Sequence, residues 1–397
     1  MLKIYSKLLL TSTLLSATLY ADNIKSKTEI KKSAFETVWE HTYGGEDDDI
    51  ANGIVMLENG DTAIVGTCKS YNAKRSDICV MRMDSKGKMK WRKMLGGKKK
   101  DRGLVISRAS DGNLLVAGEG KSFNHNADQD LYIAKLSLTG KVLWEHAFGG
   151  DRDEYIAGVA GTNDGGALLI GNSESFSKKG YKDIYIVRLD KEGKMLSTQT
   201  IGGKLNDEAT ALTRTADGNF IMVGSREVKH AGNADFFLMK LNQSGQKIWA
   251  RTLGQKDNDV LTAVAPTPNG GIVATGRTRS YNSAQTDLAV MNFNKEGKLV
   301  WFKIYGFKYY DEGNAITMSK NGEYLLAGKT NSMGKGDYDI YTIALDKEGT
   351  LIWSSLYGKE NKDIAHAVTR TSDGGLIIVG ESDSFSRSKN FYIIKLK

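Results

Sequence analysis

The sequence predicts an all-β fold, and two observations lead to that prediction. A short motif with a central glycine recurs every 52 or 53 residues along most of the 397-residue chain, and all six tryptophans share one phase of this period. The motif glycines are Gly44, Gly96, Gly149, Gly202, Gly254, Gly306 and Gly358. Four-stranded units repeated four to eight times build a β-propeller, so the seven copies predict a seven-bladed β-propeller.

Each repeat can be divided into four strands. A polar loop follows the motif glycine and ends in an acidic residue, where the first strand begins. An Asp-Gly or Asn-Gly pair, such as Asp111-Gly112, then predicts a tight turn, because these residues tolerate positive φ. An apolar second strand ends in glycine, and a loop of about ten residues leads to a third strand such as DIYIVRLD (183–190). A turn such as 191–193 leads to the fourth strand, which carries the tryptophan.

Residues present in every copy are interpreted as structural. Five residues before each motif glycine stands a tryptophan, with Ser197 in the remaining copy: Trp39, Trp91, Trp144, Trp249, Trp301 and Trp353. An acidic residue opens each first strand, with Glu154 in the third copy: Asp49, Asp101, Asp207, Asp259, Asp311 and Asp363. A second acidic set opens the third strands, with Asn390 in the last copy. We expect these carboxylates to cap turns by accepting backbone N–H bonds. The alternative is that they converge to bind cations or to act in acid–base chemistry.

The two ends of the repeat array complement each other. The repeats begin with a lone fourth strand around Trp39 and end at Lys397 with a third strand, FYIIKLK. Residues 35–43 therefore complete the last blade, and a single propeller is predicted over 35–397, with its ring closed by the N-terminal strand. Closure removes open sheet edges. The alternative, an open solenoid, would need terminal caps that the sequence lacks.

The first 34 residues precede the repeats. Residues 1–21 combine Lys3 and Lys7, a short apolar run and Ala21, which is typical of a secretory signal peptide. Residues 22–34 are a polar leader. No later segment has the roughly 18–20 apolar residues of a membrane-spanning helix. We expect a soluble, exported protein, periplasmic or secreted, and a monomer.

Cys68 and Cys79 fall on neighbouring antiparallel strands of one repeat. An exported protein can keep a disulfide, so the pair is either bridged or two buried thiols. Two cysteines alone do not make a four-ligand zinc site. We expect neither a metal nor a cofactor.

Two further groups of residues are candidates for binding. Loops between second and third strands carry a large side chain after serine, either to stack on a partner or to plug the gap between blades: Tyr71, Phe123, Phe176, Tyr281 and Phe385. Basic residues outside the repeat pattern form either an anionic-ligand patch or solvated loops: Lys98, Lys99, Lys100, Lys74, Arg75, Lys178 and Lys179. The run 308–310, Lys-Tyr-Tyr, also breaks the pattern.

The repeat, of the form YGG…D…DGG…G…D-[IL]-Y…G…W, resembles that of bacterial secreted seven-bladed propeller proteins, in the wider WD40-like and quinoprotein-like group. The segment TGKVLW (139–144) is similar to the tryptophan-docking segment of quinoprotein-type propellers. That group includes dehydrogenases and an outer-membrane assembly scaffold. The Trp-Asp pair of WD40 repeats is absent.

The function favoured by these patterns is an exported, non-enzymatic binding or scaffolding module whose partner in the cell envelope is a protein or an anionic glycan. The net charge of +8 fits an anionic partner, although lysines can also serve solubility. No nucleic-acid partner is expected. The sequence shows no G-x-S-x-G elbow, phosphate loop or Cys–His pair, so no catalytic residue is assigned. The alternatives are a polysaccharide lyase or hydrolase and an outer-membrane assembly factor.

Overall fold

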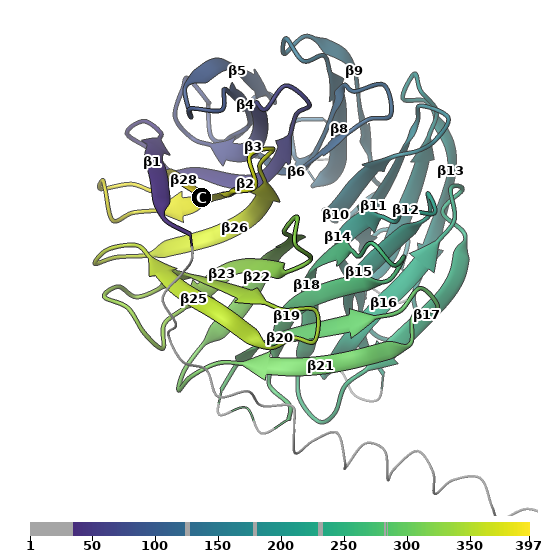
Figure 1. Ribbon diagram of the computed structural model, residues 1–397. Coiled ribbons are helices and arrows are strands. Elements are labelled where there is room, and N and C mark those ends of the chain that lie inside the picture. Colours follow the sequence, from purple (N-terminus) through teal and green to yellow (C-terminus); the bar gives the residue numbers. More distant parts are fainter. Residues whose placement is uncertain (1–34, 124–127, 178–180, 229–232, 282, 284) are drawn as a thin grey trace, which may run out of the picture.

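The computed structural model describes residues 35–123, 128–177, 181–228, 233–281, 283 and 285–397. In these residues, seven four-stranded antiparallel sheets are arranged around a common axis, which confirms the predicted seven-bladed β-propeller (Figure 1). The predicted signal peptide, the leader, Lys178 and Lys179 lie outside the described residues. No helix long and apolar enough to cross a membrane occurs in the described part of the chain.

Six blades are built from consecutive strands, called A to D from the axis outward. Blade 1 comprises β2 (Asp49–Met56), β3 (Thr62–Cys68), β4 (Asp77–Met83) and β5 (Met89–Leu95). Blade 2 comprises β6 (Asp101–Arg108), β7 (Leu114–Gly120), β8 (Asp130–Leu136) and β9 (Val142–Phe148). Blade 3 comprises β10 (Glu154–Gly161), β11 (Ala167–Ser173), β12 (Asp183–Leu189) and β13 (Met195–Ile201).

The second half of the ring repeats the same order. Blade 4 comprises β14 (Asp207–Arg214), β15 (Phe220–Glu227), β16 (Ala234–Leu241) and β17 (Lys247–Leu253). Blade 5 comprises β18 (Asp259–Pro266), β19 (Ile272–Thr278), β20 (Asp287–Phe293) and β21 (Leu299–Tyr305). Blade 6 comprises β22 (Asp311–Met318), β23 (Tyr324–Thr330), β24 (Asp339–Leu345) and β25 (Leu351–Tyr357).

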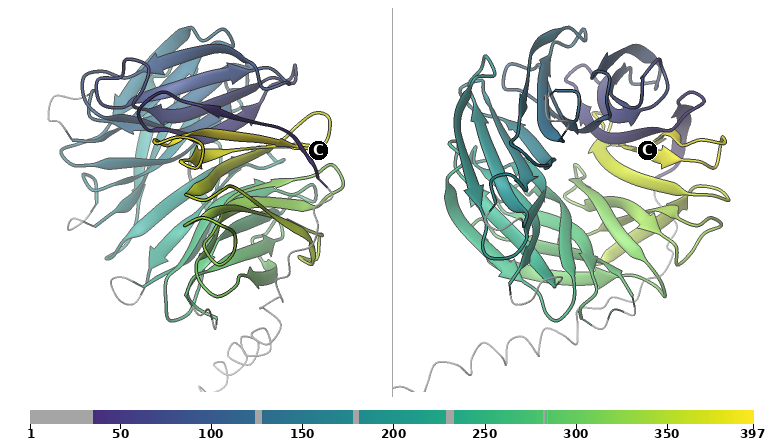
Figure 2. Two further views of the ribbon diagram at one scale, coloured as in Figure 1. Left: turned by 90° about the vertical axis from the view of Figure 1, so that its left-hand side faces the viewer. Right: turned by 180° about the vertical axis from the view of Figure 1, so that it is seen from behind.

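Blade 7 closes the ring with strands from both parts of the chain. Its inner strands are β26 (Asp363–Arg370), β27 (Leu376–Ser382) and β28 (Asn390–Leu396), and its outer strand is β1 (Thr37–Tyr43). β1 lies antiparallel beside β28, where the two ends of the colour scale meet in Figures 1 and 2. Two further backbone bonds of 2.9 Å join Glu36 and Lys397 in both directions. The closure predicted from the sequence is therefore confirmed.

The hydrophobic core is divided among the interfaces between adjacent blades. Val223 and Phe236 of blade 4, for example, share one buried cluster with Leu261, Ala274 and Met291 of blade 5. The B and C strands are nearly all buried because neighbouring blades cover both of their faces, whereas the D strands are mostly exposed or half-buried, with buried residues chiefly in β21 and β25. Each blade thus depends on its neighbours for burial, as in other repeat proteins.

The tryptophans tie each blade to the next. The indole N–H of Trp91 donates to the Leu138 carbonyl at 3.0 Å, in the C–D turn of blade 2. Trp144 and Trp301 make the same contact with the following blades. These rings are half-buried, but Trp353 is only 3% exposed. Blade 7 has no C–D turn, and Phe35 packs against Trp353 instead, with ring centroids 5.6 Å apart.

The two ends of the blades form different faces of the ring. One, the turn face, carries the tight A–B and C–D turns, whose glycines have positive φ, such as Gly165 (φ 89°) and Gly193 (φ 85°). The other, the long-loop face, carries the D–A and B–C loops, because strands alternate in direction within each sheet.

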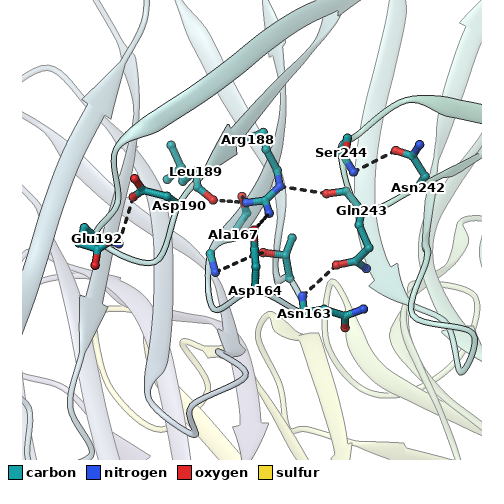
Figure 3. A network of polar contacts seen from close by, with 12 residues as sticks. Asn163, Asp164, Ala167, Arg188, Leu189, Asp190, Glu192, Asn242, Gln243 and Ser244 are labelled. Atoms are coloured by element: carbon teal, nitrogen blue, oxygen red, sulfur yellow. Dashed lines mark hydrogen bonds and ion pairs between the residues drawn. The ribbon is translucent and has the colours of Figure 1, made fainter.

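Ion pairs stabilise the turn face. In Figure 3, the guanidinium of Arg188 donates to Asp164 at 2.5 Å and to the Gln243 carbonyl at 2.9 Å, which joins blade 3 to a turn of blade 4. A Lys or Arg at this place in the C strand pairs with the A–B turn aspartate in five blades: Arg82–Asp61, Lys135–Asp111, Arg188–Asp164, Lys240–Asp217 and Lys395–Asp373. Repetition of the pair in five blades indicates a structural role.

Candidate functional site

The acidic residues that open the A strands act as caps on the long-loop face. Asp49 is fully buried, and its carboxylate accepts backbone N–H bonds from Gly45 (2.9 Å), Lys69 (3.1 Å) and Ser70 (3.2 Å). The bonds tie the D–A loop to the neighbouring B–C loop. Equivalent bonds are made from the same register position by Asp101, Glu154, Asp259, Asp311 and Asp363. Asp207 differs, because it pairs with Arg226.

The second acidic set lies next to the first, across each motif glycine. A Cβ placed on Gly96 would lie 2.8 Å from an oxygen of Asp77 and 2.8 Å from one of Asp101. Only glycine fits there without displacing these groups. Burial, and then the charge of Asp101, raise the pKa of Asp77 to about 6. Among the described residues, carboxyl groups with a raised pKa occur only in these two repeated sets: Asp77, Asp207, Asp259, Asp311 and Asp339.

These pKa shifts therefore follow the repeat and do not single out one pocket. An active site would be expected to bring perturbed groups together at one place. Nor do three or more His, Cys, Asp or Glu side chains gather into a potential metal site anywhere in the described ranges.

The five loop aromatics mostly pack inward. Phe123 stacks on Tyr132 of its own blade at 4.2 Å, and Tyr281 meets Phe302 edge-on at 5.0 Å. Phe385 lies against Tyr392, and Tyr71 lies under the Arg92 guanidinium. Phe176 contacts Tyr185 but remains 43% exposed. Each of these rings thus contacts a side chain of its own blade, and Phe176 keeps exposed surface.

The predicted basic residues that the structure describes lie at the seam between blades 1 and 2. A parallel bridge joins Ser76 to Lys100, which brings the segment of Lys74 and Arg75 beside that of Lys98 and Lys99. All of these side chains are exposed except that of Lys99, which is half-buried. The structure thus brings five of the seven predicted basic residues together.

The two cysteines are buried free thiols in the structure. Cys68 ends β3 and Cys79 lies in β4, in the core cluster between blades 7 and 1. Burial, followed by hydrogen bonding to Cys79, raises the pKa of the Cys68 thiol. Such a thiol is unreactive at neutral pH because the thiolate is the nucleophile.

The seams between adjacent blades are of two kinds, which differ in the residue just before the A strand. At four seams it is Asp or Asn, and its side chain accepts a backbone N–H from the loop before the C strand of the preceding blade: Asp48, Asp153, Asn206 and Asn258. At the other three seams, an isolated backbone bridge takes the place of this side-chain bond, at Lys100, Tyr310 and Lys362. A backbone bond from the first residue of the A strand to the preceding blade occurs at both kinds of seam, for example from Asp49 N to Lys389 O. These three side chains are released from capping and are available to form a surface.

Tyr310 and Lys362 belong to a cluster on blades 6 and 7, which we call the aromatic–basic cluster: Tyr310, Tyr338, Lys329 and Lys362. The Lys329 ammonium lies 5.4 Å from the ring centroid of each tyrosine, and Lys362 lies 5.7 Å from that of Tyr338. The two tyrosine rings meet edge-on at 6.2 Å. These distances are within the range of cation–π attraction.

A buried carboxylate organises this cluster. Glu312 is 4% exposed and pairs with Lys329 at 3.2 Å and with Arg277 of blade 5. The Tyr310 hydroxyl donates to the same carboxylate at 3.5 Å. The single negative charge of Glu312 thus balances only one of its two cationic partners, Lys329 and Arg277. Lys362 has no carboxylate partner in the described residues. The cluster therefore carries net positive charge.

A pocket of about 420 Å³ adjoins the cluster between blades 4, 5 and 6. One wall is basic and aromatic and the other is formed by carboxylates and carboxamides, and the chief residues are Arg277, Arg279, Tyr310, Asn206, Glu208 and Glu227. A pocket of about 590 Å³ on the other side, between blades 6 and 7, includes Lys335, Asp339 and Lys359.

The sequence analysis noted Tyr309 and Tyr310 as a break in the motif, but it missed Arg277, Lys329, Tyr338 and Glu312. A signal for them was present. The position of Arg277 in the seven repeats carries Thr67, Glu119, Asn172, Ser225, Arg277, Lys329 and Glu381. It lies near the end of an apolar strand, yet it is polar in every copy and differs in charge from copy to copy.

Comparisons with known proteins were made for the sequence and for the fold. No protein-family model matches the chain. Among curated proteins, the Regulatory protein FlaEY of Caulobacter vibrioides is 24% identical over 229 residues. This match covers 48% of this chain and 24% of that protein, so it spans about a quarter of the relative's length.

Among solved structures, the Pan2 WD40 domain of Neurospora crassa is similar with a TM-score of 0.55 and 11% identity, covering 93% of this chain and 97% of that one. Sqt1 from Chaetomium thermophilum has a TM-score of 0.51 and 12% identity, with 87% and 83% covered. A puromycin hydrolase has a TM-score of 0.52 and 14% identity, with 85% of this chain but only 50% of that one covered. At these identities the likeness shows the fold alone: a WD40-like seven-bladed β-propeller.

Proposed function

We propose that the protein is an exported, non-enzymatic binding module that recognises a protein or glycan partner in the cell envelope through its long-loop face. One observation supports this proposal above the others. Positions that build the ring are nearly constant between repeats, whereas the positions around the aromatic–basic cluster differ from repeat to repeat. Symmetry of the fold does not require Tyr310, Lys329 or Lys362, so a role outside folding explains them best.

Charge and exposure favour an anionic partner. Tyr309 is 41% exposed, the Lys308 ammonium lies 5.1 Å from its ring centroid, and the cluster beside them has net positive charge. Aromatic and cationic side chains together are typical of the energetically important part of an interface. The second basic region, at Lys98 and Lys100, lies on the same face and extends the surface available to a large partner.

Export and membership of the bacterial secreted propeller proteins are part of this proposal. They rest on the N-terminal pattern and on the repeat motif. Cell fractionation, together with N-terminal sequencing of the mature protein, tests them. Recovery of the uncleaved chain in the cytoplasm would contradict export.

The binding role is tested by affinity capture from an envelope extract. The wild-type protein is compared with a Tyr309→Ala/Lys362→Ala variant and with a turn-face control, Lys191→Ala, which removes one exposed charge elsewhere. We expect one stoichiometric protein or one glycan class, retained by the wild type and the control and lost by the double variant. Equal retention by all three, or retention of nothing, contradicts the proposal.

A further inference from the structure

We infer that the pocket between blades 4, 5 and 6 binds an acidic saccharide, with an anionic group on Arg279 and hydroxyl groups on the opposite wall. This inference rests on the proposed function and specifies the ligand of the same face. It is carried by the chemistry of the two walls, by the volume of the pocket and by the departure of its residues from the repeat.

The basic wall has an available cation. Arg277 is held by Glu312, but the Arg279 guanidinium is exposed and has no side-chain partner in the described residues. A guanidinium binds a carboxylate or a sulfate through two parallel hydrogen bonds. Arg279 is therefore the residue that would bind the anionic group of a ligand.

The opposite wall is suited to hydroxyl groups. Glu208 and Glu227 place carboxylates in the pocket, where Glu208 lies 3.9 Å from Lys182 and Glu227 accepts a hydrogen bond from the Asn206 amide at 3.2 Å, and Asn258 adds a carboxamide. The Asn258 Oδ1 already accepts the Ala234 N–H at 2.9 Å, which leaves its amide N–H groups as donors. Carboxylates accept hydrogen bonds from hydroxyls but repel a second carboxylate.

This combination favours a sugar over an acidic peptide. An acidic peptide carries closely spaced carboxylates, and Glu208 and Glu227 would repel them. A uronic acid carries one carboxylate on a ring rich in hydroxyls, so it can satisfy both walls at once. Tyr310 adds apolar ring surface to the same pocket, and about 420 Å³ lies within the usual range for small-ligand sites.

The test is isothermal titration of the wild-type protein with three probes: methyl galacturonoside, which has one carboxylate, the neutral methyl galactoside, and diglutamate. We expect methyl galacturonoside to bind at least about tenfold more tightly than either of the others, since only it satisfies both walls. Arg279→Ala should weaken that binding by about tenfold or more. Arg214→Ala removes an exposed arginine from the turn face of blade 4, and it should leave binding unchanged.

Two further variants separate ring stacking from charge. Tyr310→Phe keeps the ring and should retain affinity, whereas Tyr310→Ala should lose it, with thermal melts showing that both variants are folded. Diglutamate binding as tightly as methyl galacturonoside, an equal loss in Arg214→Ala, or no binding of methyl galacturonoside at millimolar concentration would each overturn the inference. Capture of a protein partner through Tyr309 and Lys362, without saccharide binding, would leave the proposed function standing and refute only this pocket.

Discussion

Replacement of Asp77 by asparagine should stabilise the protein at neutral pH. The Oδ1 atom of Asp77 is enclosed and has no hydrogen-bond partner among the described residues, and it faces Gly96 together with Asp101. Burial first, and the charge of Asp101 second, raise the pKa of Asp77 to about 6. Blade 7 already carries this substitution, because Asn390 occupies the same register position opposite Asp49.

The magnitude follows from linkage between protonation and folding. The pKa of Asp77 rises from 3.8 to about 6 on folding, and each pKa unit corresponds to about 1.4 kcal/mol. Because Asp77 is only partly buried, solvent screening reduces the expected cost to about 1 kcal/mol. The folded state holds the proton more tightly than the unfolded state, so this cost is absent below about pH 4, grows as the pH rises and is complete above about pH 6.5.

Urea denaturation of the wild type and Asp77→Asn at about pH 4 and about pH 7.5 measures this difference. We expect equal free energies of unfolding at the lower pH and a gain of about 1 kcal/mol for the variant at the higher pH. Asp111→Asn is the matched control of opposite sign, because pairing with Lys135 outweighs burial and lowers the pKa of Asp111. A loss of stability in Asp77→Asn at about pH 7.5, or a gain that persists at about pH 4, would refute the reasoning.

Two further predictions concern the motif glycine and the ring closure. Gly202→Ala should lower the free energy of unfolding by about 2–3 kcal/mol in urea denaturation, because its Cβ would lie 1.9 Å from Asp183 Oδ1. Gly203→Ala is the control: the nearest atom to its Cβ would be 3.5 Å away, so it should change stability by less than about 0.5 kcal/mol. Equal losses would contradict the steric explanation. Trp353→Ala should cost about 3–5 kcal/mol and Phe35→Ala about 2 kcal/mol, with a coupling of about 0.5–1.5 kcal/mol in a double-mutant cycle. Strict additivity would show that Phe35 does not substitute for the missing turn.

Local features of the sequence were sufficient to predict the architecture. Turn glycines and strand composition recur in every copy and the tryptophan recurs in six of the seven, so the copies support one another. The degree of burial was less predictable. Trp144 and Trp353 occupy the same repeat position, yet only Trp353 is nearly buried, because its neighbour is the closing blade. The burial of each tryptophan therefore depends on which segment packs against it in the folded ring.

The candidate site was harder to predict because its residues come from different repeats and from different register positions. Arg277 lies in β19 of blade 5, Lys329 in β23 of blade 6, and Lys362 just before β26 of blade 7. No short motif contains them together. Their assembly depends on the rotation from blade to blade, which places the ends of successive strands side by side only once the ring is built.

Comparison between the repeats nevertheless separates folding from function at the residue before each A strand. Where this residue is Asp or Asn, its side chain bonds the preceding blade, as Asn258 does to the Ala234 N–H. Where it is Lys100, Tyr310 or Lys362, an isolated backbone bridge takes the place of that side-chain bond. The ring thus closes with either arrangement, so stability does not explain the choice of lysine or tyrosine. Two of the three exchanged residues are neighbours in the aromatic–basic cluster, and the third lies in the other basic region of the same face. This distribution is expected if binding, rather than folding, determines which residue occupies those three positions.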